Sequence, residues 1–211
     1  MKNHDRFSST KLIGLTGPMA SGKNLAASIL EGFGCVSVDA DKLVHQAVET
    51  AKDQIIEIFG INAKEMKIEI LNPDGTINRR QLARIVFQSE ENLRKQEQIV
   101  HPIVEKLTLD FIEQNSDKVV IVNATVLHKI ELVKNCDALI FITAPTLKRL
   151  FRAKKRDHLS TKQILQRFHS QKHLFTKYKK LNSDIYRVMN FGSKAKLERS
   201  LAKVFKEIIS L

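Results

Sequence analysis

The chain has 211 residues, of which 43% are hydrophobic and 27% are charged, as expected for one globular domain with a substantial core. No apolar run approaches the ~20 residues of a membrane-spanning helix, and the polar start MKNHDRFSST lacks the apolar segment of a secretory signal. We therefore expect a cytoplasmic protein with no membrane partner. The net charge of +12 comes almost wholly from Lys148 to Lys180, where twelve Lys and Arg residues accompany one acid, Asp157.

The first fifty residues alternate between short apolar runs and helical patterns. KLIGLT (11–16) predicts a buried strand, and LAASIL (25–30) predicts a helix that ends before two glycines. CVSVD (35–39) predicts a second strand, and the apolar spacing of residues 40–49 predicts a second helix. This alternation indicates a parallel sheet with crossover helices.

The middle of the chain carries helical signals and no strand. Asn72-Pro73-Asp74-Gly75 predicts a turn, and Asn78 is a suitable N-cap for a helix through Phe87. A second helix is expected from Ser89. The pair His101-Pro102 predicts its end, with a third helix over 103–114. The pattern favours a helical insertion.

Strand patterns return in the last part of the chain. VVIVN (119–123), ALIFIT (138–143) and IYRVMN (185–190) predict three more strands, and residues 194–209 predict a closing helix. The basic block between them predicts two or three helices. The fold class is therefore α/β, a doubly wound parallel sheet of five strands. Its ligands should lie at the carboxyl ends of the strands.

The stretch GPMASGKN follows the first predicted strand and matches the phosphate-loop pattern G-x-x-x-x-G-K-[ST] at seven of eight positions. Glycines allow backbone N–H groups to approach phosphate, the following helix adds its N-terminal dipole, and Lys23 adds a positive charge. The expected nucleotide-binding residues are Gly17, Pro18, Met19, Ala20, Ser21, Gly22, Lys23, Asn24 and Leu25. Asn24 replaces the hydroxyl that normally binds Mg²⁺, so weaker metal binding is expected.

Several ordered motifs, taken with this loop, resemble the dephospho-coenzyme A kinase family. They run along nearly the whole chain: VDADKLVHQAV (38–48), DGTINRRQLARIVF (74–87), HPIV (101–104), LFRAKKRD (150–157), RFHSQ (167–171) and NFGS (190–193). The resemblance implies a P-loop kinase-like fold in a single domain. Its core would comprise about 10–59, 117–147 and 184–211, with a helical substrate-binding insertion at about 60–116 and a basic lid at about 148–183.

The resemblance also implies a reaction, the transfer of the ATP γ-phosphate to the ribose 3′-hydroxyl of dephospho-CoA, with Mg²⁺ as cofactor. Asp41 matches the family's proposed general base, with Lys23 on the phosphates. Asp39 would contact the acceptor or the metal, or would only cap the next helix. We expect Asp39 and Asp41 to point to different sides of a turn that follows the strand.

Arginines and one histidine complete the expected site. Arg152 and Arg156 lie four residues apart, hence on one helical face, and would close over the transferred phosphate. The alternative is a solvated basic face. The resemblance places His101 at the family's acceptor site, although a lone histidine could also be structural. Arg79 and Arg80 are candidates to contact the acceptor, and of the two we expect Arg79 to do so.

The sequence departs from the family at three places. Asn24 is the first, and Ala20, where glycine is usual, is the second. After the third strand the family usually has an acidic residue, a proline, two leucines and a glutamate, whereas this chain has VNATVLHK (122–129), with His128 near the glutamate position. Asn123 could replace one polar contact but no charge. A slowed enzyme or a non-catalytic relative therefore remains an alternative.

Two other functions fit parts of the sequence. One is a kinase of another nucleoside or nucleotide, which the motifs at 74–87 and 101–104 argue against. The other is nucleic-acid binding by the basic block, but no nucleic-acid module is present. The aromatic residues of that block are expected to pack in the core: Phe151, Phe168, Phe175 and Tyr178.

The sequence does not distinguish a monomer from a homo-oligomer. Cys35 and Cys136 have no zinc-site spacing, and both are expected to be small core residues with free thiols.

Overall fold

The computed structural model describes residues 10–127, 131–157, 159–179 and 184–210. Backbone contacts divide the chain into two compact units. The first combines Met1–Asp39 with Asp110–Leu211, and the second is Ala40–Leu109.

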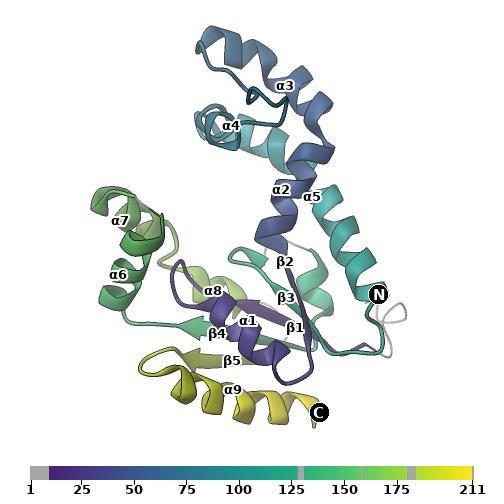
Figure 1. Cartoon of the computed structure of the whole chain (residues 1–211), viewed down its shortest axis with the longest axis vertical. Coiled ribbons are helices and arrows are strands. Elements are labelled where there is room, and N and C mark those ends of the chain that lie inside the picture. Colours follow the sequence, from purple (N-terminus) through teal and green to yellow (C-terminus); the bar gives the residue numbers. More distant parts are fainter. Residues whose placement is uncertain (1–9, 128–130, 158, 180–183, 211) are drawn as a thin grey trace. The chain divides into compact units, whose positions relative to one another are not determined.

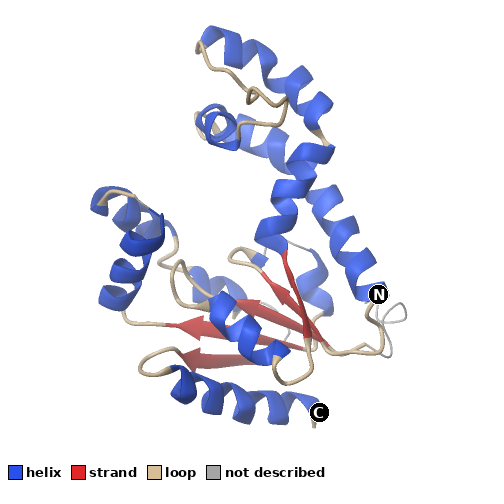
Figure 2. Cartoon of the chain, viewed as in Figure 1, coloured by secondary structure: helices blue, strands red, loops and turns tan. Residues whose placement is uncertain are grey.

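A five-stranded parallel sheet forms the centre of the first unit, with the strand order β2-β3-β1-β4-β5. The strands are β1 (Leu12–Thr16), β2 (Val36–Asp39), β3 (Val120–Asn123), β4 (Ala138–Thr143) and β5 (Asp184–Met189), shown in Figures 1 and 2. All residues of β1 and β3 are buried, because helices cover both faces of a parallel sheet. The predicted doubly wound α/β fold is confirmed.

Helices α1 (Lys23–Glu31) and α9 (Lys194–Ile209) pack together over one face of this sheet, and α9 runs beside β5 (Figure 1). Their apolar residues form one buried cluster with β1 and β4, in which Ile13, Leu30 and Leu201 are almost fully inaccessible. Ser193 caps α9 by accepting a hydrogen bond from the Lys196 N–H. This packing fixes the start of α1, and with it the loop that follows β1.

The basic block contains three helices, α6 (Thr146–Asp157), α7 (Thr161–Ser170) and α8 (Leu174–Tyr178). A capping box formed by Ser160 and Gln163 begins α7. A short 3₁₀ helix, Glu131–Asn135, precedes β4. The prediction of two or three helices for the block is confirmed.

The second unit contains α2 (Ala40–Thr50), α3 (Lys52–Glu65), α4 (Arg79–Val86) and most of α5 (Glu90–Glu113). Asn78 caps α4, as predicted, by accepting from the Gln81 N–H. The predicted turn separates Leu71 from Ile77, which form an isolated antiparallel bridge. The unit starts earlier than the predicted insertion, because α2 and α3 pack with each other and α3 packs with α4.

The predicted helix break at His101-Pro102 is wrong, because α5 continues through Pro102 as one helix. Proline removes one backbone hydrogen bond and normally kinks or ends a helix. Here Ile99, Val100 and Val104 on either side are buried, and their packing supports the helix through the proline. Tertiary burial thus overrides the local preference.

Buried thiols and rings match the prediction with one exception. Cys35 and Cys136 are buried and form no disulfide, and burial raises the pKa of the Cys35 thiol to about 11. Phe175 and Tyr178 pack edge-on against Phe141, and Phe168 packs against the buried cluster of Met19, Ala153 and Ile164. Phe151 contradicts the expected core packing, because it is 73% exposed.

Within the described ranges, no helix is both long enough and apolar enough to span a membrane.

Candidate functional site

The loop between β1 and α1 has a backbone that requires small residues. Gly17 and Gly22 have φ values of 153° and 99°, and Ala20 has a φ of 60°. A Cβ atom on Gly17 would collide with the Ile142 carbonyl, and one on Gly22 would collide with the Asn190 side chain. Ala20 therefore adopts a left-handed conformation that costs an L-residue about 1 kcal/mol and that glycine would adopt freely.

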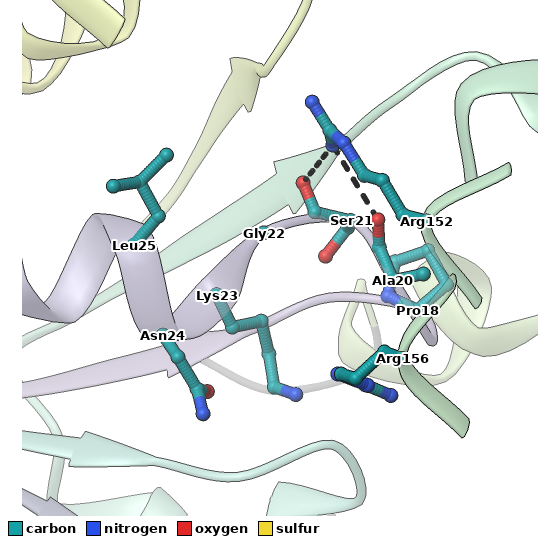
Figure 3. Close-up of a pocket in the computed structure, with 9 residues that line it drawn as sticks. All are labelled: Pro18, Ala20, Ser21, Gly22, Lys23, Asn24, Leu25, Arg152 and Arg156. Carbon is teal, nitrogen blue, oxygen red and sulfur yellow. Dashed lines mark hydrogen bonds between the residues drawn. The ribbon is translucent and has the colours of Figure 1, made fainter. Parts of the chain in front are cut away.

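A hollow beside this loop brings most of the predicted nucleotide-binding residues together with two predicted arginines (Figure 3). Its lining consists of Pro18, Ala20, Ser21, Gly22, Lys23, Asn24, Leu25, Arg152 and Arg156. The loop supplies one wall and α6 supplies the other. Gly17 and Met19, also predicted, do not line it.

Met19 instead anchors the loop to the helices of the basic block. Its side chain is 8% exposed and packs with Ala153 and Ile164. Its N–H donates to Gln171 Oε1 at 2.7 Å, and its carbonyl accepts from Arg149 Nε at 2.8 Å. Both backbone groups of this loop residue are therefore bound, one by Arg149 in α6 and the other by Gln171, which caps the end of α7.

Arg149 is a partly buried cation beside the loop. Its guanidinium lies 4.0 Å from the centre of the Phe168 ring, and its Nη2 is buried without a hydrogen-bond partner in the described structure. The pKa of Arg149 lies below its usual value, because partial burial disfavours the charged guanidinium. An anion in the neighbouring hollow would offset that penalty.

Arg152 and Asn190 bind the carbonyl side of the loop. Arg152 Nη1 donates to the carbonyls of Ser21 at 3.2 Å and Ala20 at 3.4 Å (Figure 3). Asn190 Nδ2 donates to Ser21 O at 2.8 Å, and Asn190 Oδ1 accepts from Arg152 Nη2 at 3.4 Å. These bonds hold the Ala20 and Ser21 carbonyls on the side of the loop that faces Arg152 and Asn190.

The segment after β3 contacts Lys23. Lys23 Nζ donates to Thr125 Oγ1 at 2.8 Å. The Thr125 carbonyl in turn accepts from the Tyr178 hydroxyl at 3.4 Å, and that hydroxyl is 2.8 Å from Thr16 Oγ1 at the end of β1. Tyr178 is fully buried, so this network connects the loop lysine to the interior of the unit.

A second contact joins the same segment to Asn24, whose Oδ1 accepts from Asn123 Nδ2 at 3.1 Å. Asn123 is 3% exposed, and its own Oδ1 is buried without a partner in the described part of the chain. Asn123 pairs in register with Asp39, so three oxygen-bearing side chains occur at the ends of β2 and β3 and the start of α1.

The other predicted residues lie in the second unit. Asp41 is exposed in the first turn of α2, which begins directly after Asp39, so the expected turn between the two aspartates is absent. Arg79 is exposed at the start of α4. His101 is half-buried in α5 and lines a shallow hollow with Arg94 and Glu97. His128 lies outside the described residues.

The sequence patterns missed four residues that contact the loop: Arg149, Gln171, Thr125 and Asn190. Arg149 precedes Arg152 by one helical turn, and this spacing could have identified it. Gln171 and Asn190 belong to motifs that carried the family resemblance, but no pattern assigned them a contact. Thr125 gave no signal, because only the fold brings it to Lys23.

Comparisons with known proteins agree with this geometry. A family model described as dephospho-CoA kinase matches residues 11–192. A dephospho-CoA kinase of Treponema denticola is 38% identical over 200 residues, covering 93% of this chain and 89% of that protein.

Two solved structures are also similar. One from Thermus thermophilus has a TM-score of 0.78 at 28% identity, covering 93% of this chain and 96% of that one. A dephospho-CoA kinase from Campylobacter jejuni has a TM-score of 0.64 at 25% identity, covering 95% and 98%. The chain has a phosphate loop with two arginines beside it, and the family model matches most of its length. The chain therefore belongs to the dephospho-CoA kinase family and is a kinase.

Proposed function

We propose that this kinase transfers the γ-phosphate of ATP to the ribose 3′-hydroxyl of dephospho-CoA, giving CoA and ADP. The observation that carries the proposal is the hollow in which the phosphate loop faces Arg152 and Arg156, in a chain whose family match spans residues 11–192. Phosphoryl transfer depends mainly on positioning and on neutralising the charge of the phosphates, and this hollow offers both.

The loop and α1 would bind the ATP phosphates. The N-terminus of α1 has no acidic residue in its first turn, so the N–H groups of that turn and the helix dipole would favour an anion. Lys23 would bind the β- and γ-phosphates. Arg152 and Arg156 would stabilise the charge on the transferred phosphoryl group, a role that other phosphotransferases give to an arginine finger.

Asp41 would accept the proton of the attacking 3′-hydroxyl. Oxygen of the acceptor attacks phosphorus, the bond to the ADP oxygen breaks, and the acceptor proton passes to the carboxylate. Asp39, Arg79 and His101 would bind the acceptor. Arg79 and His101 are accessible on two different helices of the second unit, as binding residues must be.

Mg²⁺ is the metal that such a reaction implies, and the residues beside the loop fit it as oxygen ligands. Asn24 and Asp39 are the candidates from the sequence, and the unpartnered buried Oδ1 of Asn123 adds a third oxygen. The described residues contain no cluster of three or more His, Cys, Asp or Glu suited to a metal. Phosphate oxygens and water would therefore supply the remaining ligands. The ion would neutralise charge on the β- and γ-phosphates.

A coupled assay tests the function. Purified protein is incubated with ATP, Mg²⁺ and dephospho-CoA, and ADP release and CoA formation are both measured. We expect one ADP for each CoA, and a rate in Asp41→Ala lower by about 10²-fold or more.

Three outcomes would contradict the proposal. ADP release that does not depend on dephospho-CoA would indicate another acceptor. A rate no higher than that of Asp41→Ala would indicate a non-catalytic relative. Binding of single-stranded nucleic acid that weakens steeply with salt, without turnover, would favour the nucleic-acid alternative.

A further inference from the structure

Two of the places where this chain departs from its family contact each other. Asn24 stands in the loop where the pattern has Ser or Thr, and Asn123 lies in the segment that lacks the usual acidic residue. They are 99 residues apart in sequence, and a hydrogen bond of 3.1 Å joins their side chains. The two replacements therefore form one local structure.

The side chains usual in the family and the two asparagines of this chain differ in charge. A hydroxyl and a carboxylate together offer a divalent ion one negative charge, whereas two amides offer none. An amide pair still offers two carbonyl oxygens, which are acceptable but weaker ligands of a hard cation. One amide N–H group is used in the bond between the residues, which fixes the direction of both side chains.

The burial of Asn123 indicates that this pair has a ligand. Asn123 is 3% exposed, and its Oδ1 has no hydrogen-bond partner within the described residues. A buried carbonyl oxygen without a donor is destabilising unless a cation, or water bound to one, reaches it. Asn24 at the other end of the pair is exposed and lines the hollow of the loop.

We propose that Asn24 and Asn123 act as one neutral amide pair that binds the divalent ion in place of the family's hydroxyl and carboxylate. The inference rests on the proposed function only in assuming that nucleotide and metal bind together at this loop. It predicts that Mg²⁺ strengthens nucleotide binding only slightly in this protein, because the pair contributes no charge. It also predicts that Asn24 depends on Asn123 for its effect.

Calorimetry of ADP binding with and without Mg²⁺ tests the pair directly. The ratio of the two affinities measures the coupling between metal and nucleotide, which usually falls between about 5-fold and 150-fold. We expect a ratio below ~3-fold for the parent protein.

The decisive comparison uses a carboxylate of the same size as the amide. Asn24→Asp keeps the bond from Asn123 and adds a charge at an exposed position, so the ratio should rise to ~10-fold. Combining it with Asn123→Ala should return the ratio to the parent value, because the carboxylate is no longer held. A ratio that stays high in the double variant, or an unchanged ratio in Asn24→Asp, would overturn the pairing.

Two controls keep the result unambiguous. Gln114→Glu adds a carboxylate at an exposed position after α5 and should leave the ratio unchanged. If Asn123→Ala lowers the melting temperature too far, Asn123→Ser gives the same comparison with a smaller cavity. The assay contains no acceptor and needs no turnover. A negative result would overturn the amide pair alone, whereas failure of the kinase assay would overturn the proposed function alone.

Discussion

The phosphate-loop unit and the helical unit present their predicted site residues in different ways. In the first unit, side chains from α6 and from the segments that follow β3, α7 and β5 bind the loop or Lys23 by hydrogen bonds, as Arg149, Thr125, Gln171 and Asn190 show. In the second unit, Asp41 and Arg79 are exposed at the starts of separate helices. Under the proposed function, nucleotide phosphates would meet a loop that hydrogen bonds already hold in place, whereas the acceptor would meet accessible side chains of the second unit.

Lys23→Met in the first unit and Asp41→Asn in the second should have the largest effects on turnover, and only the first should affect ADP binding. Both should lower turnover by about 10²-fold to 10³-fold, because Lys23→Met removes the charge proposed to stabilise the phosphates and Asp41→Asn removes the proposed base. Calorimetry should show ADP binding weakened by at least ~10-fold in Lys23→Met, since a charged contact to phosphate is lost. Asp41→Asn should bind ADP like the parent. Weaker ADP binding in Asp41→Asn would contradict the division of roles.

Arg149→Met should weaken ADP binding by ~10-fold, the loss expected for one charged interaction. The unliganded melting temperature should change little, since the variant removes a desolvated charge together with its contacts to Met19 and Phe168. Lys154→Met, at an exposed position of the same helix, is the matched control and should change neither quantity. Loss of stability without loss of ADP affinity would show that Arg149 is purely structural.

Thr125→Val should lower the ADP affinity and turnover by about 3-fold to 10-fold. The substitution keeps the shape of the side chain but removes the hydroxyl that holds Lys23 Nζ, a bond worth about 1 kcal/mol. Thr176→Val, at an exposed position of α8, is the control. Equal kinetics in Thr125→Val and the parent would show that Lys23 needs no such support.

Two substitutions to glycine, one in each unit, should have the smallest effects, and they should differ in their effect on ADP binding. Ala20 and Lys67 are the non-glycine residues with positive φ among those described, at 60° and 54°. Replacing either with glycine should raise the melting temperature by about 2 °C, because relief of strain exceeds the added entropy of the unfolded chain.

Only Ala20→Gly should also change ADP binding, since Lys67 follows α3 in the second unit and its N–H donates to Lys64 O. A drop in melting temperature for Ala20→Gly would show that the methyl group packs usefully. A change in ADP affinity for Lys67→Gly would show that the two units are coupled.

The strands and the loop could be predicted because their signals are local. Continuous apolar runs gave all five strands to within one residue at either end, and two glycines before a lysine indicated the phosphate loop. The helix across Pro102 could not be predicted, since burial of Val100 and Val104 outweighs the missing hydrogen bond. Exposure of Phe151 was missed for the converse reason, because apolar spacing on a helix does not show which neighbour is available to cover it.

By itself, the sequence determined the α/β class, the phosphate loop and the arginines Arg152 and Arg156, because each depends on residues close together in the chain. The tertiary structure alone decided which side chains bind that loop. Asn123 meets Asn24 and Thr125 meets Lys23 because β3 pairs beside β1 in a parallel register, Leu15 opposite Asn123. A sheet places the ends of distant strands side by side, and no local pattern records that neighbourhood.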